Sequence, residues 1–141
     1  MQNIHVSTEE GNILVLTFVG EIKDVTDIES FKYDLETVAD TVKQMSAASG
    51  HGIKVLIDVT HFTANYVSEG VDALVDLAEH DESLVERTAI FGGSLKVRAI
   101  GETIIVTANR KNIKFFKTKA ESIAWLKSEV DTENIGTSAV I

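Results

Sequence analysis

The apolar and polar positions along the chain follow two periods, one typical of strands and one typical of helices. A short apolar stretch at residues 4–6 is followed by the turn-forming residues TEEGN and then by the β-rich run ILVLTFVGEI at residues 13–22. Val, Ile, Thr and Phe favour extended backbone, and Gly and Asn favour turns. The chain therefore opens with a predicted β-hairpin.

A long amphipathic helix is predicted from Thr26 onward. Its apolar positions recur at spacings of three and four, which lines one helical face, and they are Ile28, Phe31, Leu35, Val38, Val42 and Met45. Thr26 and Glu29 have the spacing of a capping box, and Gly50 and Gly52 mark the end of the helix.

The remainder of the chain alternates between short strands and helices. The predicted strands are IKVLID at 53–58, TAIFGG at 88–93 and NIKFF at 112–116. A helix with Ser68 near its cap follows the first of these strands, one capped by Ser94 follows the second, and one with a Thr118–Glu121 capping box follows the third. We expect Gly101 to weaken or bend the helix after Ser94.

This order predicts an α/β fold with a mixed, mostly parallel five-stranded sheet and about four helices, because strands that alternate with helices pair in parallel through crossovers. One domain is expected over residues 1–130, followed by a flexible C-terminal tail at 131–141.

Composition excludes several classes of function. The 141 residues carry no cysteine, which excludes disulfides and thiolate metal sites and agrees with a reducing, cytoplasmic location. A net charge of -9 argues against binding nucleic acid, and no apolar run approaches the length of a membrane span. We expect no metal, because His5, His51 and His80 lack the spacing of zinc ligands, and no cofactor, because FGGS matches neither the P-loop nor the dinucleotide-binding motif.

Charge is distributed unevenly. Residues 67–86 carry seven acidic side chains and no Lys or Arg, whereas residues 96–119 carry a single acid and seven bases: Lys96, Arg98, Arg110, Lys111, Lys114, Lys117 and Lys119. Opposite patches of this kind favour association of two copies, so we expect a homodimer ahead of contact with an anionic lipid surface.

Several stretches, taken in order, resemble the STAS superfamily and, within it, the SpoIIAA-like (STAS/SEC14-like) branch. The resemblance is carried by GIKVLIDVTHF, YVSEGVDALV, ERTAIFGG and IKFFKTKAESIAWL and covers about residues 10–130. It implies the SpoIIAA-like fold. It also implies a regulatory protein without catalytic residues, whose partner is a kinase or an anti-sigma-type regulator.

In anti-sigma-factor antagonists of this superfamily, a serine at the start of the second helix is phosphorylated, and Ser68 is the matching residue. The family's Asp-Ser-Ser/Thr-Gly motif is degenerate here, because the segment reads NYVSEG. The resemblance then implies a partner-binding loop at residues 59–70 together with the helix that follows. Its candidate residues are Asp58, Thr60, His61, Phe62, Asn65, Tyr66, Ser68 and Glu69.

Each of these residues also has a structural interpretation. Ser68 caps a helix in the ordinary way, Asp58 bonds to nearby amides in a turn, and His61 lies on the surface. A small hydrolase built from Ser68, Asp58 and His61 is a third hypothesis, although no oxyanion donors accompany them. The glycines of FGGS are explained by a tight turn without any bound anion.

The second functional hypothesis is a carrier or sensor of a small lipophilic ligand. The resemblance implies an apolar cleft between helices and sheet, and the candidate pocket residues are Phe62, Tyr66, Ile100 and Ile104. Aromatic side chains in and beside strands also serve as ordinary core residues.

Overall fold

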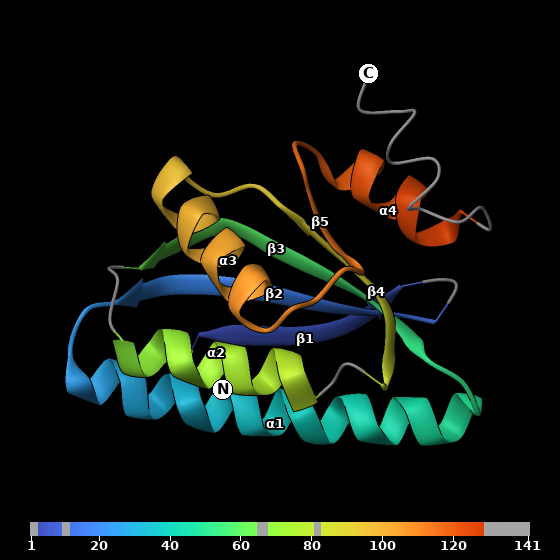
Figure 1. Cartoon of the computed structure of the whole chain (residues 1–141), viewed down its shortest axis with the longest axis horizontal. Helices are drawn as coiled ribbons and strands as arrows, with labels where there is room; N and C mark the ends of the chain where they lie inside the picture. Colours follow the sequence, from blue (N-terminus) through green and yellow to red (C-terminus); the bar gives the residue numbers. More distant parts are fainter. Residues whose placement is uncertain (1–2, 10–11, 65–67, 81–82, 129–141) are drawn as a thin grey trace.

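The structure is a computed structural model that describes residues 3–9, 12–64, 68–80 and 83–128 (Figure 1). Within residues 64–70 the backbone is described at residue 64 and from residue 68 onward, without the side chains. The elements are β1 (Ile4–Glu9), β2 (Ile13–Ile22), α1 (Val25–Ser49), β3 (Ile53–Ala64), α2 (Ser68–His80), β4 (Val85–Phe91), α3 (Leu95–Thr107), β5 (Ile113–Phe116) and α4 (Lys119–Lys127).

The five strands form one mixed sheet in the order β1-β2-β3-β4-β5. β1 pairs with β2 antiparallel as a hairpin, and every later neighbour pair is parallel. Each crossover therefore steps to the next strand in the same direction, and crossovers of one hand place their helices on one face of the sheet. These findings confirm the predicted fold class, including the opening hairpin.

Alternate residues of the strands face two separate cores. One set, which includes Leu14, Leu16 and Phe18 of β2, packs with the buried face of α1 and with partly buried residues of α2. The other set, which includes Ile13 and Val15, packs with Leu126 of α4. Figure 1 shows α1 and α2 running side by side, with α4 apart from them. The helices α1, α2 and α3 thus cover one face and α4 covers the other.

The helix caps were predicted with one error. α1 begins at Val25 and not after Thr26, because the Oδ1 of Asp24 accepts the amide of Asp27 at 2.9 Å while Asp27 accepts the amide of Lys23. The predicted Thr26–Glu29 box is therefore wrong by two residues.

Other caps are as predicted. Ser94 caps α3, and Thr118 caps α4 by accepting the amide of Glu121. Gly50 ends α1 in the left-handed conformation, with φ 76°. α3 runs unbroken through Gly101, and the expected weakening or bend there stays a prediction. Glycine is needed instead for packing, since a Cβ would lie 2.6 Å from the Phe115 ring.

The end of β3 differs from the prediction, and the predicted end of the domain lies outside the described residues. β3 does not end at Asp58 but continues to Ala64. The predicted flexible tail at 131–141 lies outside the described residues, so both it and the proposed domain boundary stay predictions.

Candidate functional site

The middle of β3 contains a β-bulge. Thr17 of β2 is aligned with Asp58, but Val19 is aligned with His61, so β3 has one residue more than β2 across this interval. The Oδ1 of Asp58 accepts the backbone amide of Thr60 at 2.8 Å. The carboxylate thereby satisfies an amide within the irregular segment, which agrees with the structural interpretation of Asp58 as a residue that bonds to nearby amides.

The extra residue changes which side chains face the core. Val59 and Phe62 are buried, whereas Thr60, His61 and Thr63 are exposed. The Phe62 ring lies 5.3 Å from Phe18 and 5.9 Å from Phe31, measured between ring centroids. The expectation of a free loop from residue 59 is therefore wrong. The segment is part of β3, with Thr60, His61 and Thr63 exposed and Val59 and Phe62 buried.

This part of β3 projects beyond its neighbour. Pairing between β3 and β4 ends at Asp58 and Phe91, and from His61 to Ala64 β3 pairs with β2. Gly92 and Gly93 follow β4 with φ near 80° and 82°. A Cβ on Gly92 would collide with Thr60, so the glycines allow the chain to pass close to the bulge as it turns into α3. The turn interpretation of FGGS is confirmed.

The projecting strand lies at the edge of the sheet where parallel strands end and helices begin. Open α/β sheets usually bind their ligands at this edge. α3 starts there with Leu95, whose side chain is 88% exposed, and α1 starts there with Val25, which is 65% exposed. We call Thr60, His61, Thr63, Val25 and Leu95 the carboxyl-edge surface. Leu95 and Val25 were not predicted from the sequence to be on the surface. They are exposed because each is the first residue of its helix, although both are apolar.

The remaining loop candidates are less completely described. Asn65 and Tyr66 lie outside the described residues, and for Ser68 and Glu69 the structure gives backbone only. α2 begins at Ser68, as expected from the sequence. Three roles of the Ser68 hydroxyl therefore stay predictions. They are helix capping, phosphorylation, and a place beside Asp58 and His61 in a hydrolase.

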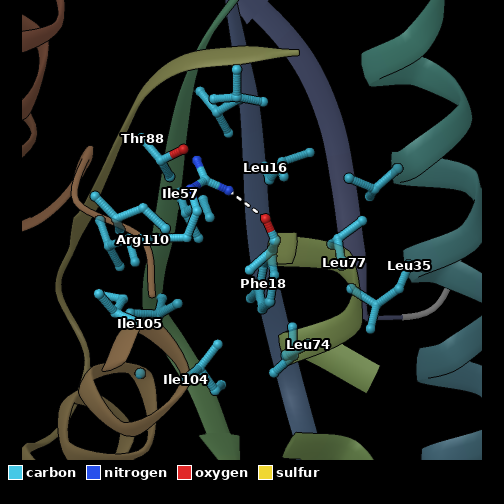
Figure 2. A pocket seen from close by; sticks show the side chains of 18 of the residues that line it. Leu16, Phe18, Leu35, Ile57, Leu74, Leu77, Thr88, Ile104, Ile105 and Arg110 are labelled. Carbon is cyan, nitrogen blue, oxygen red and sulfur yellow. Dashed lines mark hydrogen bonds between the residues drawn. The ribbon is translucent and has the colours of Figure 1, made fainter. Parts of the chain in front are cut away.

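A cavity of about 150 Å³ lies between the sheet and the helices (Figure 2). Of the four candidate pocket residues, Phe62 and Ile104 line this cavity. Ile100 is not among its lining residues and packs instead with Val71 and Val75 of α2, because its position on α3 faces that helix. Tyr66 lies outside the described residues.

The cavity lining also includes two polar residues, Thr88 and Arg110, that were not predicted from the sequence. The sequence offered one signal for Thr88, which is the hydroxyl residue that opens the predicted strand TAIFGG ahead of three apolar residues.

In the basic stretch at residues 96–119, one of the seven basic side chains is buried, and two exposed ones, Arg98 and Lys119, make contacts within the chain. Arg110 is buried, with Nη1 2.6 Å from the carbonyl of Ala78. Lys119 pairs with Glu9 at 2.6 Å, and the guanidinium of Arg98 lies 5.3 Å from the Phe115 ring centroid. The association of two copies through this stretch remains a prediction.

Among the described residues, no three or more acidic or histidine side chains gather into a metal-binding group. No helix in the described ranges is both long enough and apolar enough to span a bilayer.

Comparison with known proteins finds the same architecture elsewhere. No protein-family profile matches the sequence. No curated protein matches it either. Solved structures do match. A protein of the DUF3478 family from Shewanella loihica PV-4, described as having a SpoIIAA-like fold, is 20% identical with a TM-score of 0.57, over 87% of this chain and 91% of that one.

Two further structures are named as anti-sigma factor antagonists. SpoIIAA in its unphosphorylated form is 13% identical with a TM-score of 0.56, over 89% of this chain and 98% of that one. An antagonist from Mycobacterium paratuberculosis is 14% identical with a TM-score of 0.59, over 89% and 93% of the two chains. The protein therefore has the SpoIIAA-like fold that its sequence resemblance implied.

Proposed function

We propose that the protein is a non-enzymatic regulatory module that binds a protein partner through the carboxyl-edge surface and α2. The observation that carries the proposal is the projecting half of β3, where exposed Thr60, His61 and Thr63 stand beyond the end of β4. A strand paired along one side offers backbone groups to a partner. Leu95 adds an exposed apolar side chain of the kind that interfaces bury.

Two solved structures with this fold are named for antagonism of an anti-sigma factor, which is an action on another protein. That comparison supports a protein partner for this chain. Ser68 at the start of α2 is the proposed modification site, because free amides and the helix dipole favour a phosphate there. Phosphorylation would place about two negative charges beside the carboxyl-edge surface and weaken a contact with a partner that approaches it.

The test compares two exposed apolar positions at opposite ends of one helix. Leu95 starts α3, and Val106, which is 78% exposed, lies near its end. Leu95→Ser should reduce recovery of a specific partner from an extract of the encoding organism by about tenfold, since a buried leucine at an interface contributes about 1.5 kcal/mol or more. Val106→Ser is the matched control and should leave recovery unchanged.

Equal recovery with both variants would overturn the assignment of the surface. The switch has its own variant, Ser68→Asp. Unchanged recovery with Ser68→Asp would remove the switch and leave the surface in place.

The cavity favours a second candidate function, that of a carrier or sensor of a small lipophilic ligand. Its lining is largely apolar and includes Phe62 and Ile104. Native mass spectrometry of gently purified protein tests this candidate, because a retained ligand adds mass to the intact chain. A chain that carries no added mass and takes up no apolar probe would rule the candidate out.

A further inference from the structure

The cavity lies between the sheet and the helices, and residues of α2 line part of it. α2 packs chiefly against its neighbours α1 and α3, whereas α1 and α3 contact the strands directly. The space under α2 and α3 is closed below by side chains of β2, β3, β4 and β5. Its volume of about 150 Å³ is that of a cavity which holds a single benzene ring. Drug-sized ligands occupy about 300 Å³ or more. A single ring or a short acyl chain therefore fits, and a two-chain lipid does not.

One wall of the cavity has a polar residue where the pattern calls for an apolar one. The register aligns Leu14, Val55, Thr88 and Ile113 across four neighbouring strands, all on the face covered by α1, α2 and α3. Thr88 is 6% exposed and lines the cavity. No hydrogen bond of its hydroxyl is found within the described part of the chain. Valine has nearly the same shape and would fill this row without burying a hydroxyl.

A second polar group reaches the same cavity. Arg110 is also 6% exposed, and its Nε and Nη1 donate to the Oδ1 of Asn112 at 2.8 Å and the carbonyl of Ala78 at 2.6 Å. These bonds fix the orientation of the planar guanidinium. In Figure 2 the Thr88 hydroxyl is seen toward this guanidinium, with Ile57 next to them. The cavity thus has an apolar body and one polar corner.

We propose that this cavity binds a small organic acid whose apolar body, a single ring or a short acyl chain, fills the space under α2 and α3 and whose carboxylate accepts a hydrogen bond from Thr88 beside Arg110. The proposal deepens the second candidate function and rests on it, while the carboxyl-edge surface is independent of it. A guanidinium and a hydroxyl are the donors that proteins use for carboxylates. The Thr88 hydroxyl on the cavity lining would gain an acceptor when such a ligand is bound.

The experiment uses two probes of similar size, benzoate and toluene, with the full chain, and measures binding by calorimetry and melting temperature with and without probe. We expect benzoate to bind more tightly than toluene. Thr88→Val should weaken benzoate binding by about tenfold, since a hydrogen bond to a charged group is lost, and should leave toluene binding unchanged. Without probe, Thr88→Val should melt at a higher temperature than the wild type, which shows that the variant is folded.

Thr103→Val is the matched control, because Thr103 lies exposed on α3 and its hydroxyl bonds to the carbonyl of Ala99. It should not alter binding of either probe. Ile105→Phe adds a ring to the cavity lining and should abolish binding of both probes. Toluene binding equal to or tighter than that of benzoate, or benzoate binding untouched by Thr88→Val, would overturn the carboxylate assignment while the lipophilic cavity stands. Binding of neither probe would overturn both.

Discussion

The bulge in β3 makes a sharp prediction about two adjacent residues. Phe62 faces the core and His61 faces solvent, but a strand without the bulge would reverse them, because successive side chains point to opposite faces. Phe62→Ala should therefore destabilise the protein strongly, and His61→Ala should be nearly neutral. The pair of substitutions reports on the register of the strand and not merely on composition.

The magnitude follows from the contacts of Phe62. Its side chain is 8% exposed and packs edge-on against Phe18 at 5.3 Å and in a stacked arrangement with Phe31 at 5.9 Å. Truncation of a buried phenylalanine to alanine costs about 3 to 5 kcal/mol, and it would also enlarge the cavity that Phe62 lines. An exposed substitution such as His61→Ala changes the free energy of unfolding by about 0.5 kcal/mol or less.

Urea denaturation provides the assay, followed by circular dichroism and by the fluorescence of the single tryptophan. Trp125 packs against Phe116 on the other face of the sheet, with ring centroids 5.5 Å apart, so its fluorescence reports unfolding at a place remote from Phe62. Phe62→Leu, which removes less side chain, gives a smaller loss if the alanine variant does not fold. A larger loss for His61→Ala than for Phe62→Ala would refute the register and the surface built on it.

Three further predictions concern single contacts. Gly92→Ala should destabilise the protein by more than about 2 kcal/mol, since positive φ and a collision with Thr60 add together. Gly50→Ala, whose Cβ meets nothing within 4 Å, should cost only about 1 kcal/mol, and equal losses in thermal melts would contradict the close approach at Gly92. Arg87 donates to the carbonyls of Trp125 and Ser128 at 2.8 and 2.7 Å and so anchors the end of α4. Arg87→Met should therefore lower the free energy of unfolding by about 2 kcal/mol and shift the Trp125 fluorescence to the red. An unshifted spectrum would argue against this anchoring. Thr118→Ala should cost about 1 kcal/mol in a urea titration through loss of the α4 cap, and an unchanged midpoint would contradict that role.

The bulge explains why the sequence predicted the succession of strands and helices along the chain but not the end of β3. Ile57 and Val59 alternate as strand residues should, and a strict period of two would then put His61 on the core face. The hydrophobic pattern is broken there, so Asp58 looked like the end of the strand. A signal lay elsewhere, in the length of residues 13–22, which need a parallel partner beyond Asp58.

The start of α1 shows a different limit. Asp24 with Asp27, and Thr26 with Glu29, offer two overlapping capping patterns two residues apart. Local sequence does not choose between them. The choice depends on where β2 ends, at Ile22, and on the turn that this end leaves for the chain. Caps with one candidate, such as Ser94, were predicted correctly.

The cavity could be predicted only in outline. The apolar faces of the strands and helices indicated a layered core. The position of α2, however, depends on its packing against α1 and α3, which are far from one another in the sequence. The same is true of Ile100, whose neighbours on α2 are about 25 residues earlier in the chain. Burial of Arg110 likewise depends on a carbonyl of α2 that no local pattern reveals.

Site-specific photo-crosslinking in the encoding organism tests the recognition surface most directly. A photoreactive residue at Thr63 stands on the projecting strand, and one at Tyr33, which is 67% exposed on α1, is the control. The proposed function predicts one discrete protein adduct from position 63 and none from position 33. Adducts of equal yield from both positions, or none from position 63, would contradict it.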